Sequence, residues 1–415
     1  MSASISFMDP EVQLCPFKAY DEVRGPAKVY QDPATGWYYV TDYETVRKLS
    51  ADAANLSSFT GVLMCKTKSA HQDEIDAIWQ SEGFLPTPVL VVSDPPDHAF
   101  YRSFVDRSFS PARVKRMEEY LEGIVDDIIA EHGGRDVMEF RSDVATRLTL
   151  SVIADQLGMP RSDWKQLDEW SDAVMAHQDQ SIPPEKEKAL VHKICELHQY
   201  AARKAEEYRR EPRECLLSDF ANMEVDGRRL TMREFAAMVE QGLTGGKDTS
   251  ASAMCSAMLR LCEDPALQER LRADPALIPP FFEEVLRIDS PVQGLFREAR
   301  SDLEVGGTRI PRGSVVVLKW GAANRDPAMF PEPDQLKLDR TNTRRHLTFG
   351  YGPHACVGNL LARAEARILF TKLLANMKNF RLADGPESVK RVPHFFSYGP
   401  MALHVRYESL PGAAS

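Results

Sequence analysis

The chain has 415 residues, of which 43% are hydrophobic, and its length alone would allow two or three domains. The formal net charge of −10 argues against a protein that binds nucleic acid. The 7 cysteines show no zinc, CxxC or disulfide-framework spacing, which fits the reducing cytoplasm. No signal peptide and no run of about 18 apolar residues is visible, so we expect a cytoplasmic protein that does not cross a membrane.

The first 93 residues predict a strand, a helix and a long loop. Residues 37–40 (WYYV) are typical of a strand, and Asp42 should cap a helix that ends near Leu49. Residues 51–93 contain glycines and prolines together with many apolar side chains. Long loops are usually functional or disordered, and the apolar content favours an ordered loop with a function.

Everything from residue 94 to 263 has a helical pattern. Residues 94–97 (DPPD) and 110–111 (SP) should each open a helix, and a further helix should run from about 141 to 158. Thr231 and Glu234 are the ends of a capping box, and the pattern that follows continues to residue 262. That is about 48 Å of helix at 1.5 Å per residue, which is long enough to cross a whole domain.

The last third of the chain adds short strands to the helices. Two more helices are predicted within 266–289, and strands are predicted at 303–307, 313–318 and 401–407. The fold class is therefore mainly α with small β-sheets (α+β). We expect a single domain over residues 1–415. Its β-rich part should come from about 30–60, 295–320 and 390–407, and its α-rich part from about 94–290 and 355–380.

A glycine-rich turn at 349–358 (FGYGPHACVG) delivers Cys356 to the start of a predicted helix. Unpaired N–H groups and the positive end of the helix dipole favour a thiolate at that place. Such a thiolate can be a nucleophile, a redox thiol or a ligand to a metal or haem iron, and the alternative is a buried structural cysteine. Gly358 leaves one helix face bare, which suits a large flat group close to the sulfur.

The long helix contains a second unusual sequence at Gly245-Gly246-Lys247-Asp248-Thr249. Two adjacent glycines inside a helix cost roughly 2 kcal/mol relative to alanine, and the close approach of a ligand would explain them. An acid next to an alcohol beside a bare helix groove suits proton delivery. A kinked packing helix is the alternative explanation.

Two pairs of residues and one arginine are further candidates for a functional or structural role. Glu284 and Arg287 are spaced i, i+3 and can form an ion pair, which at such spacing is usually a weak surface pair. His98 and Arg102 are spaced i, i+4 and could hold one anion, although a solvated helix face is the alternative. Arg297 follows an apolar segment and could reach a buried anion.

Taken together, these residues resemble the cytochrome P450 family of haem-thiolate monooxygenases, and in particular its soluble bacterial branch. The resemblance covers roughly residues 35–407. The matches are Phe349, Gly352, Cys356 and Gly358 in F-x-x-G-x-x-x-C-x-G, Glu284 and Arg287 in E-x-x-R, and Gly245, Gly246, Asp248 and Thr249 in A/G-G-x-D/E-T. It implies the P450 fold, in which the long central helix crosses over the haem, and a haem b cofactor.

The resemblance also implies a role for each matching residue. Cys356 would be the thiolate ligand of the haem iron, with Phe349 packed near the sulfur and Gly358 making space for the porphyrin. Asp248 and Thr249 would deliver protons during oxygen activation, and Gly245 would leave room for O2. The residues expected to hold the haem propionates through charge-assisted hydrogen bonds are His98, Arg102, Arg297 and His354. The residues expected to have a structural role are Glu284, Arg287 and Arg340.

The family analogy suggests a substrate and an electron donor as well. The substrate should be a small to medium apolar molecule, such as a terpenoid, an aromatic or a steroid-like compound. Its expected contacts are Leu85, Val292, Leu295, Phe296, Phe395 and Phe396. No flavin or iron–sulfur motif is visible, so electrons should come from a ferredoxin and its reductase. A basic patch for the ferredoxin is predicted from Arg102, Arg113, Lys115, Arg116, Arg344, Arg345 and Arg363. We expect a monomer.

Three alternatives and one departure from the family pattern accompany this interpretation. The chain could be a haem-thiolate protein that binds ligands without turnover, a hydroxylase driven by peroxide, or a hydrolase with Cys356 as nucleophile and His354 as base. Lys247 stands where smaller or less charged residues are usual in the family. It lies about 200° around the helix from Thr249, so it should point away from the iron.

Overall fold

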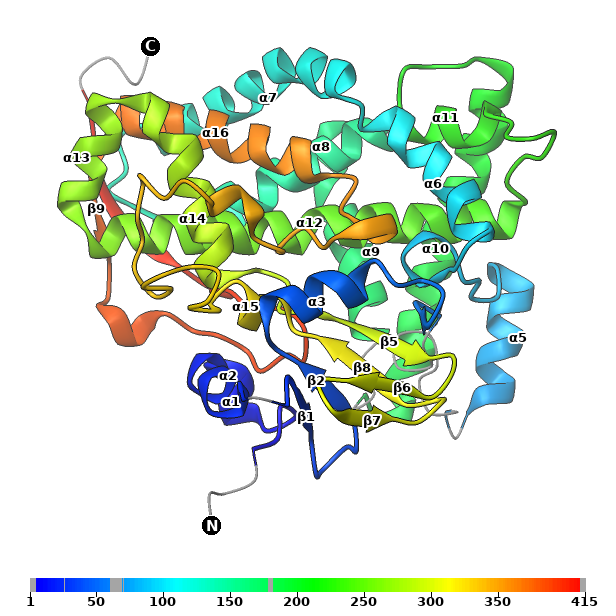
Figure 1. The fold of residues 1–415 in the computed structure, drawn as a ribbon. Coiled ribbons are helices and arrows are strands. Elements are labelled where there is room, and N and C mark those ends of the chain that lie inside the picture. Colours follow the sequence, from blue (N-terminus) through cyan, green and yellow to red (C-terminus); the bar gives the residue numbers. More distant parts are fainter. Residues whose placement is uncertain (1–4, 26, 60–68, 70, 178–181, 411–415) are drawn as a thin grey trace. The chain divides into compact units, whose positions relative to one another are not determined.

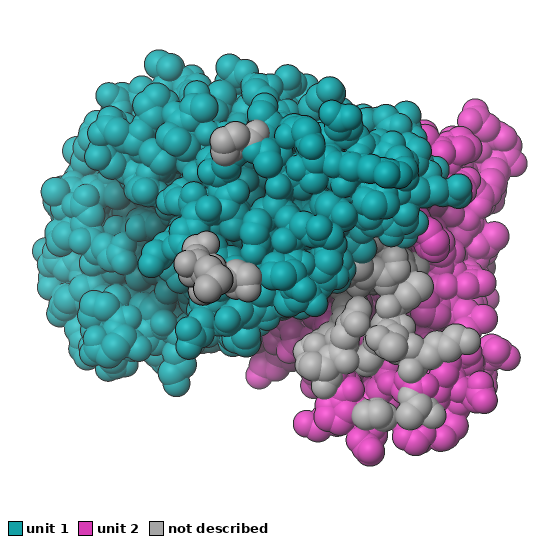
Figure 2. All heavy atoms as spheres, turned by 60° about the horizontal axis from the view of Figure 1, so that its bottom comes forward, with its two compact units in different colours: residues 1–56, 114–148, 249–415 teal, residues 57–113, 149–248 magenta. Residues whose placement is uncertain are grey.

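The computed structural model describes residues 5–25, 27–59, 69, 71–177 and 182–410. The chain divides into two compact units (Figure 2). Unit 1 consists of residues 1–56, 114–148 and 249–415, and unit 2 consists of residues 57–113 and 149–248. The described part of the chain is mainly helical with small sheets (Figure 1), which confirms the predicted fold class. The single domain over 1–415 remains a prediction.

The largest sheet of unit 1 has the strand order β1-β2-β8-β5-β3. Its strands are β1 (Val29–Gln31), β2 (Tyr38–Val40), β8 (Val315–Leu318), β5 (Leu295–Ala299) and β3 (Leu56–Ser57, which ends in unit 2). β2 is parallel to β8, with Tyr38 opposite Val316, whereas β5 is antiparallel to β8. A separate hairpin consists of β6 (Leu303–Val305) and β7 (Thr308–Ile310). The sheet therefore joins segments that are far apart in the chain.

A three-stranded sheet of unit 1 differs from the prediction. It has the order β4-β10-β9, formed by Val137–Glu139, His404–Ser409 and Met377–Leu382. β4 interrupts the region 94–263, which was expected to be entirely helical, and β9 lies partly in the segment 355–380 expected to be α-rich. Both strands pair with β10. β4 is far from β10 in the sequence, and the pairing of β9 with β10 has a register shift between Arg406 and Glu408. Nothing in the local sequence specifies such strands.

Unit 1 also contains helices. Their bounds are α1 (Pro10–Leu14), α2 (Phe17–Val23), α3 (Tyr43–Ser50), α7 (Pro111–His132, which begins in unit 2), α13 (Pro265–Ala273), α14 (Ile278–Asp289), α15 (Trp320–Ala323) and α16 (Asn359–Asn376). The predicted cap of α3 is confirmed, because Asp42 Oδ1 accepts the N–H of Thr45 at 3.1 Å.

Unit 2 is built from helices. They are α5 (Gln72–Glu82), α6 (Asp97–Ser108), α8 (Arg147–Gln156, which begins in unit 1), α9 (Trp164–His177), α10 (Pro184–Arg210) and α11 (Leu216–Asn222). The helix predicted over 141–158 is preceded by a π-helical segment, Phe140–Thr146. Residues 60–68 and 70 of the long loop predicted over 51–93, and residues 178–181, lie outside the described residues.

Helix α12 (Met232–Glu263) has 32 residues, as the sequence predicted, and passes from unit 2 into unit 1 between Asp248 and Thr249. The capping box at its start is formed in both directions. The Thr231 N–H donates to Glu234 Oε2 at 2.9 Å, and the Glu234 N–H donates to Thr231 Oγ1 at 3.3 Å. These bonds satisfy two of the N–H groups that a helix start leaves without a partner.

Candidate functional site

The cysteine turn of unit 1 is shaped by two glycines in the left-handed region. Gly350 and Gly352 have φ angles of +70° and +80°, which residues with a side chain rarely adopt. A Cβ atom on Gly352 would lie 2.8 Å from the Cα atom of Ala51, so the turn packs too closely for a larger residue. The N–H of Cys356 donates to the Phe349 carbonyl at 2.8 Å. This bond fixes where the cysteine lies.

Cys356 lies close to Gly358 at the surface of the turn. Cys356 is exposed, and α16 begins three residues later at Asn359 with Gly358 as its N-cap. The helix thus starts slightly after the predicted position. A Cβ atom built on Gly358 would meet the Cys356 Sγ at 4.0 Å and no closer neighbour among the described residues. Gly358 therefore leaves room for a flat group beside the sulfur.

An ionic cluster around the buried Glu283, which the sequence analysis missed, supports this turn. Arg363 of α16 donates to both carboxylate oxygens of Glu283, and its guanidinium lies 4.4 Å from the centre of the Phe349 ring. Arg363 Nη1 also donates to Asn359 Oδ1 at 2.8 Å, and Asn359 Nδ2 donates to the Cys356 carbonyl at 2.7 Å. Arg363 therefore connects α14 to both ends of the cysteine turn.

Hydrogen bonds keep Glu283 ionised within this cluster. Burial alone would raise the pKa of Glu283, but donors on His346 and Arg363 outweigh it and lower the pKa to about 2. His346 Nε2 lies 2.9 Å from Glu283 Oε2, and His346 Nδ1 accepts the N–H of Thr348 at 3.3 Å. This acceptor role requires a neutral ring with its proton on Nε2. Burial, which lowers the pKa of His346, favours the same neutral form.

Glu284 and Arg287 form a second cluster, which is fully buried. Both side chains are 0% exposed, and Arg287 donates to the two carboxylate oxygens at 2.7 and 3.0 Å. Arg340 Nε lies 3.1 Å from Glu284 Oε1. The other N–H groups of Arg287 donate to the carbonyls of Asn324, Pro333 and Gln335. The pair is therefore unlike the weak surface pairs that are common at this spacing.

The residues of unit 1 that were expected to contact substrate fall into two groups. Phe296, Phe395 and Phe396 form an aromatic cluster, with ring centres 5.5 Å apart for Phe296 and Phe395 and 4.9 Å apart for Phe395 and Phe396. Val292 and Leu295 instead pack, partly buried, against the apolar core around the largest sheet. Leu295 and Phe296 are neighbours in β5 and point to opposite sides of it, so a substrate on one side of β5 would meet only one of them.

The remaining predicted haem contacts of unit 1 lie on separate elements. Arg297 of β5 is buried, and its Nη1 donates to the Phe296 carbonyl at 2.7 Å. His354 is half-buried in the 3-10 turn Gly352–His354 that precedes the cysteine. Thr249 is the first residue of unit 1's part of α12.

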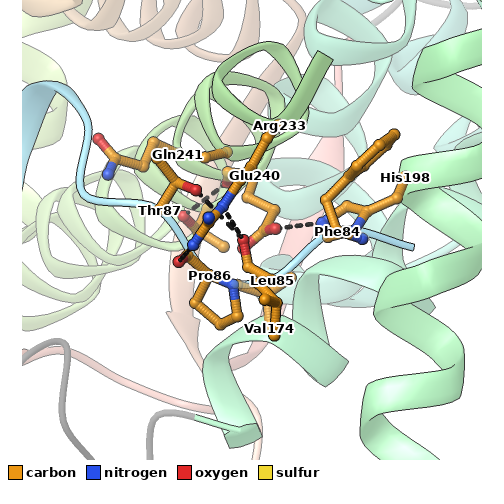
Figure 3. A pocket seen from close by; sticks show the side chains of 11 residues that line it. Phe84, Leu85, Pro86, Thr87, Val174, His198, Arg233, Glu240 and Gln241 are labelled. Atoms are coloured by element: carbon orange, nitrogen blue, oxygen red, sulfur yellow. Dashed lines mark hydrogen bonds and ion pairs between the residues drawn. The ribbon is translucent and has the colours of Figure 1, made fainter. Parts of the chain in front are cut away.

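Unit 2 holds the other predicted site residues. On α6, His98 is buried, and Arg102 Nε donates to Asp106 Oδ1 at 2.7 Å in the next turn. On α12, a Cβ atom on Gly245 would meet nothing within 4 Å, so this helix face is open. Asp248 ends unit 2's part of α12. Leu85 lines a pocket of about 90 Å³ within unit 2 (Figure 3).

Gly246 and Lys247, between Gly245 and Asp248, are explained by packing within unit 2. A Cβ atom on Gly246 would lie 3.2 Å from Ile153 Cδ1, so a larger residue would crowd α8. Lys247 is buried, and its Nζ forms ion pairs with Asp168 and Asp172 of α9. Burial alone would lower the pKa of Lys247, but the surrounding carboxylates raise it. Lys247 therefore joins α12 to α9 as a charged group.

Comparison with known proteins identifies the family. The family model for cytochrome P450 matches residues 62–280 and 276–397. The chain belongs to the cytochrome P450 family. Cytochrome P450 144 of Mycobacterium tuberculosis is 31% identical over 381 residues, which are 91% of this chain and 86% of that protein. The vitamin D(3) 25-hydroxylase of Pseudonocardia autotrophica is 34% identical over 302 residues, which are 72% and 73% of the two chains.

A solved structure shows the same fold. Cytochrome P450 CYP109Q5 from Chondromyces apiculatus superposes with a TM-score of 0.86 at 30% identity, covering 99% of this chain and 100% of that chain. The protein is thus an oxidoreductase of the P450 monooxygenase class, a family of haem-thiolate enzymes. Among the described helices of this P450, none is both long and apolar enough to span a membrane.

The cysteine turn fits a haem-thiolate cofactor. The donor is the exposed thiol of Cys356, which lies two residues before Gly358, the N-cap of α16. The absent Cβ of Gly358 leaves open the space that a porphyrin would need. The family motifs could locate this turn from sequence. They could not locate the cluster of Glu283 and Arg363, for which the position of Glu283 directly before the E-x-x-R motif was the only signal.

Proposed function

We propose that this P450 inserts one oxygen atom of O2 into a small to medium apolar substrate. The observation that carries the proposal is the exposed thiol of Cys356 beside the open face at Gly358. Haem b, when bound, would supply the activation of O2. Cys356 would be its thiolate ligand, and Phe349 would pack near the sulfur. The residues proposed to hold its propionates are His98, Arg102, Arg297 and His354, and those proposed to support the fold are Glu284, Arg287 and Arg340.

Replacing the proposed ligand should abolish oxygenation. We expect Cys356→His to lose product formation, while the purified protein can still contain haem, because imidazole is a neutral ligand that donates less electron density than a thiolate. The absorption spectrum of the reduced protein with carbon monoxide should lose the band that depends on the thiolate. The wild-type protein prepared in the same way is the control. Retained monooxygenation in the variant would show that another residue is the ligand.

Asp248 and Thr249 are the proposed proton donors. They are adjacent on α12, and the open face at Gly245 lies one turn before Thr249. We expect Thr249→Ala to bind haem normally but to release hydrogen peroxide in place of product, because the hydroxyl that passes the proton is lost. The measurement is peroxide and product per electron pair consumed, with Ser256→Ala, a buried hydroxyl further along α12, as the control. An unchanged ratio in Thr249→Ala would refute the proton role.

The substrate class is proposed from the apolar and aromatic side chains of the site. Phe296, Phe395 and Phe396 form one cluster in unit 1, and Leu85 lines a pocket in unit 2. The relative named vitamin D(3) 25-hydroxylase favours the steroid-like class among terpenoid, aromatic and steroid-like compounds. Titration with such compounds, read from the spin state of the haem, tests this. Responses to highly charged, polar compounds alone would contradict it.

A ferredoxin and its reductase are the proposed electron donors. Arg344 and Arg345 are exposed in unit 1 and could meet an acidic partner. Four other members of the predicted basic patch have acidic partners of their own, which weakens their contribution: Lys115 with Glu118, Arg363 with Glu283 and, in unit 2, Arg102 with Asp106 and Arg113 with Asp219. The monomeric state and the cytoplasmic location predicted from the sequence remain part of the proposal.

A further inference from the structure

The segment from Phe84 to Val91 in unit 2 is held mainly by side chains. Its end enters the 3-10 turn Leu90–Val92, in which the Val92 N–H donates to the Val89 carbonyl at 3.1 Å. The segment follows α5, and residues 84–89 belong to no helix or strand. Leu85, a proposed substrate contact, lies within it. Three side chains from α10 and α12 bind its backbone, namely His198, Arg233 and Gln241, and Figure 3 shows them around the pocket that the segment lines. We call these three residues the clamp.

Two residues of the clamp come from one face of α12. Arg233 donates from Nε to the Leu85 carbonyl at 2.8 Å and from Nη2 to the Pro86 carbonyl at 2.6 Å. Gln241 lies two turns further along the helix. Its Nε2 donates to the Val89 carbonyl at 3.0 Å, and its Oε1 accepts the Val91 N–H at 3.1 Å. The amide of Gln241 thus pairs with the segment as a neighbouring strand would.

His198 of α10 binds the start of the segment. Its Nδ1 accepts the N–H of Phe84 at 3.1 Å, and its Nε2 is bonded to Glu240 Oε1. Since a backbone N–H can only donate, Nδ1 must lack a proton and Nε2 must carry one. The ring is buried and lies 5.4 Å from the Trp79 ring and 5.7 Å from the Phe84 ring. Glu240 and these rings therefore orient His198 toward the Phe84 amide.

We propose that the clamp fixes the path of residues 84–91, and so sets which apolar substrates bind by fixing the position of Leu85. His198, Arg233 and Gln241 are positioning residues, because they act through the backbone of the segment. Five bonds distributed over eight residues hold an irregular segment in one conformation, and each lost bond raises the frequency of local opening. The inference rests on the proposed function only in calling Leu85 a substrate contact.

Hydrogen exchange of the holoprotein tests whether the clamp fixes the path of residues 84–91. In Gln241→Ala the amide of Val91 loses its acceptor, so we expect exchange within residues 84–92 to become about tenfold faster, since a net hydrogen bond of about 1.4 kcal/mol corresponds to a factor of 10. Gln199→Ala is the matched control. The Gln199 side chain also donates to a backbone carbonyl, that of Glu82 at 2.9 Å, but outside the segment. Equal exchange in Gln241→Ala, Gln199→Ala and wild type would overturn the clamp.

Two substitutions at His198 separate its two bonds. Asn offers an acceptor near the position of Nδ1, and Gln offers a donor near the position of Nε2. We expect His198→Asn to retain slow exchange at Phe84, and His198→Gln to retain the bond to Glu240 but to exchange several-fold faster at Phe84. Faster exchange at Phe84 in His198→Asn than in His198→Gln would show that the bond to Glu240 alone holds the segment, and would overturn the role of Nδ1.

The consequence for specificity is measured with a series of apolar compounds of increasing size, titrated into the holoprotein and read from the haem spin state. In Arg233→Ala and Gln241→Ala the ratio of dissociation constants between large and small compounds should change at least fivefold, whereas Gln199→Ala should keep the wild-type ratio. Faster exchange with an unchanged ratio would overturn the specificity role. Failure of the proposed function is distinct, because it would appear as absent turnover in the wild type with the exchange results unaffected.

Discussion

Glu284→Gln should lower the free energy of unfolding by about 3–5 kcal/mol, the usual result of removing one partner from a buried ion pair. The carboxylate and Arg287 are both fully buried, so the variant would leave the guanidinium charge without its counter-ion in the interior. Burial alone would raise the pKa of Glu284, but the bonds from Arg287 outweigh it and lower the pKa. The carboxylate is thus charged at neutral pH, and glutamine, although similar in shape, cannot replace it.

The matched control is Glu44→Gln in the same unit. Glu44 and Arg47 have the same i, i+3 spacing and lie 3.1 Å apart, but their side chains are 61% and 37% exposed. An exposed pair of this kind contributes about 0–1 kcal/mol. Urea unfolding of both variants, followed by tryptophan fluorescence, should therefore give a large shift of the midpoint for Glu284→Gln and almost none for Glu44→Gln. Similar shifts in both would mean that burial of the first pair has no energetic consequence.

The elements that the sequence predicted are those with local determinants. Asp42 caps α3, and Thr231 and Glu234 cap α12, with bonds between residues close in sequence. β4 and β9 depend on β10, whose pairing partners in β4 lie more than 250 residues away in the chain: His404 is opposite Glu139. β4 has three residues and so has no periodicity of its own to read, and β9 pairs with β10 through a shifted register. The pairing of both strands could therefore be found only in three dimensions.

The residues of the candidate site likewise fall into those that the sequence could identify and those that it could not. The turn around Cys356 and the pair of Glu284 and Arg287 have fixed spacings in the sequence and could be found from it. The partner of Arg363 is 80 residues away, at Glu283, and a lone arginine in a helix gives no indication of whether it faces a ferredoxin or a buried carboxylate. For this reason Arg363 was assigned to the basic patch, and its support of the cysteine turn was missed.

Lys319 lies in an aromatic cage in unit 1, and we expect its replacement to have a large effect on stability. Its side chain is buried, and its Nζ lies 5.1, 5.9 and 5.6 Å from the ring centres of Phe7, Tyr20 and Tyr39. Burial lowers the pKa of Lys319 from 10.5 to about 8. The faces of the three rings stabilise an ammonium by about 0.5–2 kcal/mol, but they cannot replace the water that it loses.

We expect Lys319→Met to be more stable than the wild type at pH 7 by up to about 3 kcal/mol, and the difference to shrink as the pH rises. Lowering the pKa of Lys319 from 10.5 to about 8 corresponds to about 3 kcal/mol, before the ring contacts are counted. Between pH 8 and 10.5 the unfolded chain holds the proton of Lys319 while the folded chain has released it. Stability rises with pH wherever the unfolded state binds more protons, so the wild type gains relative to the variant over this range.

Urea unfolding of both proteins at pH 7, 8.5 and 10 measures this difference directly, because groups that titrate equally in wild type and variant cancel. Lys18→Met is the control, since the Lys18 side chain is 89% exposed and its removal should change stability little at any of the three values. A wild type that is more stable than Lys319→Met at pH 7 would mean that the three rings compensate fully for burial. In that case Lys319 would stay charged in the cage. The difference in free energy of unfolding between wild type and variant should then not change with pH below the ordinary pKa of lysine.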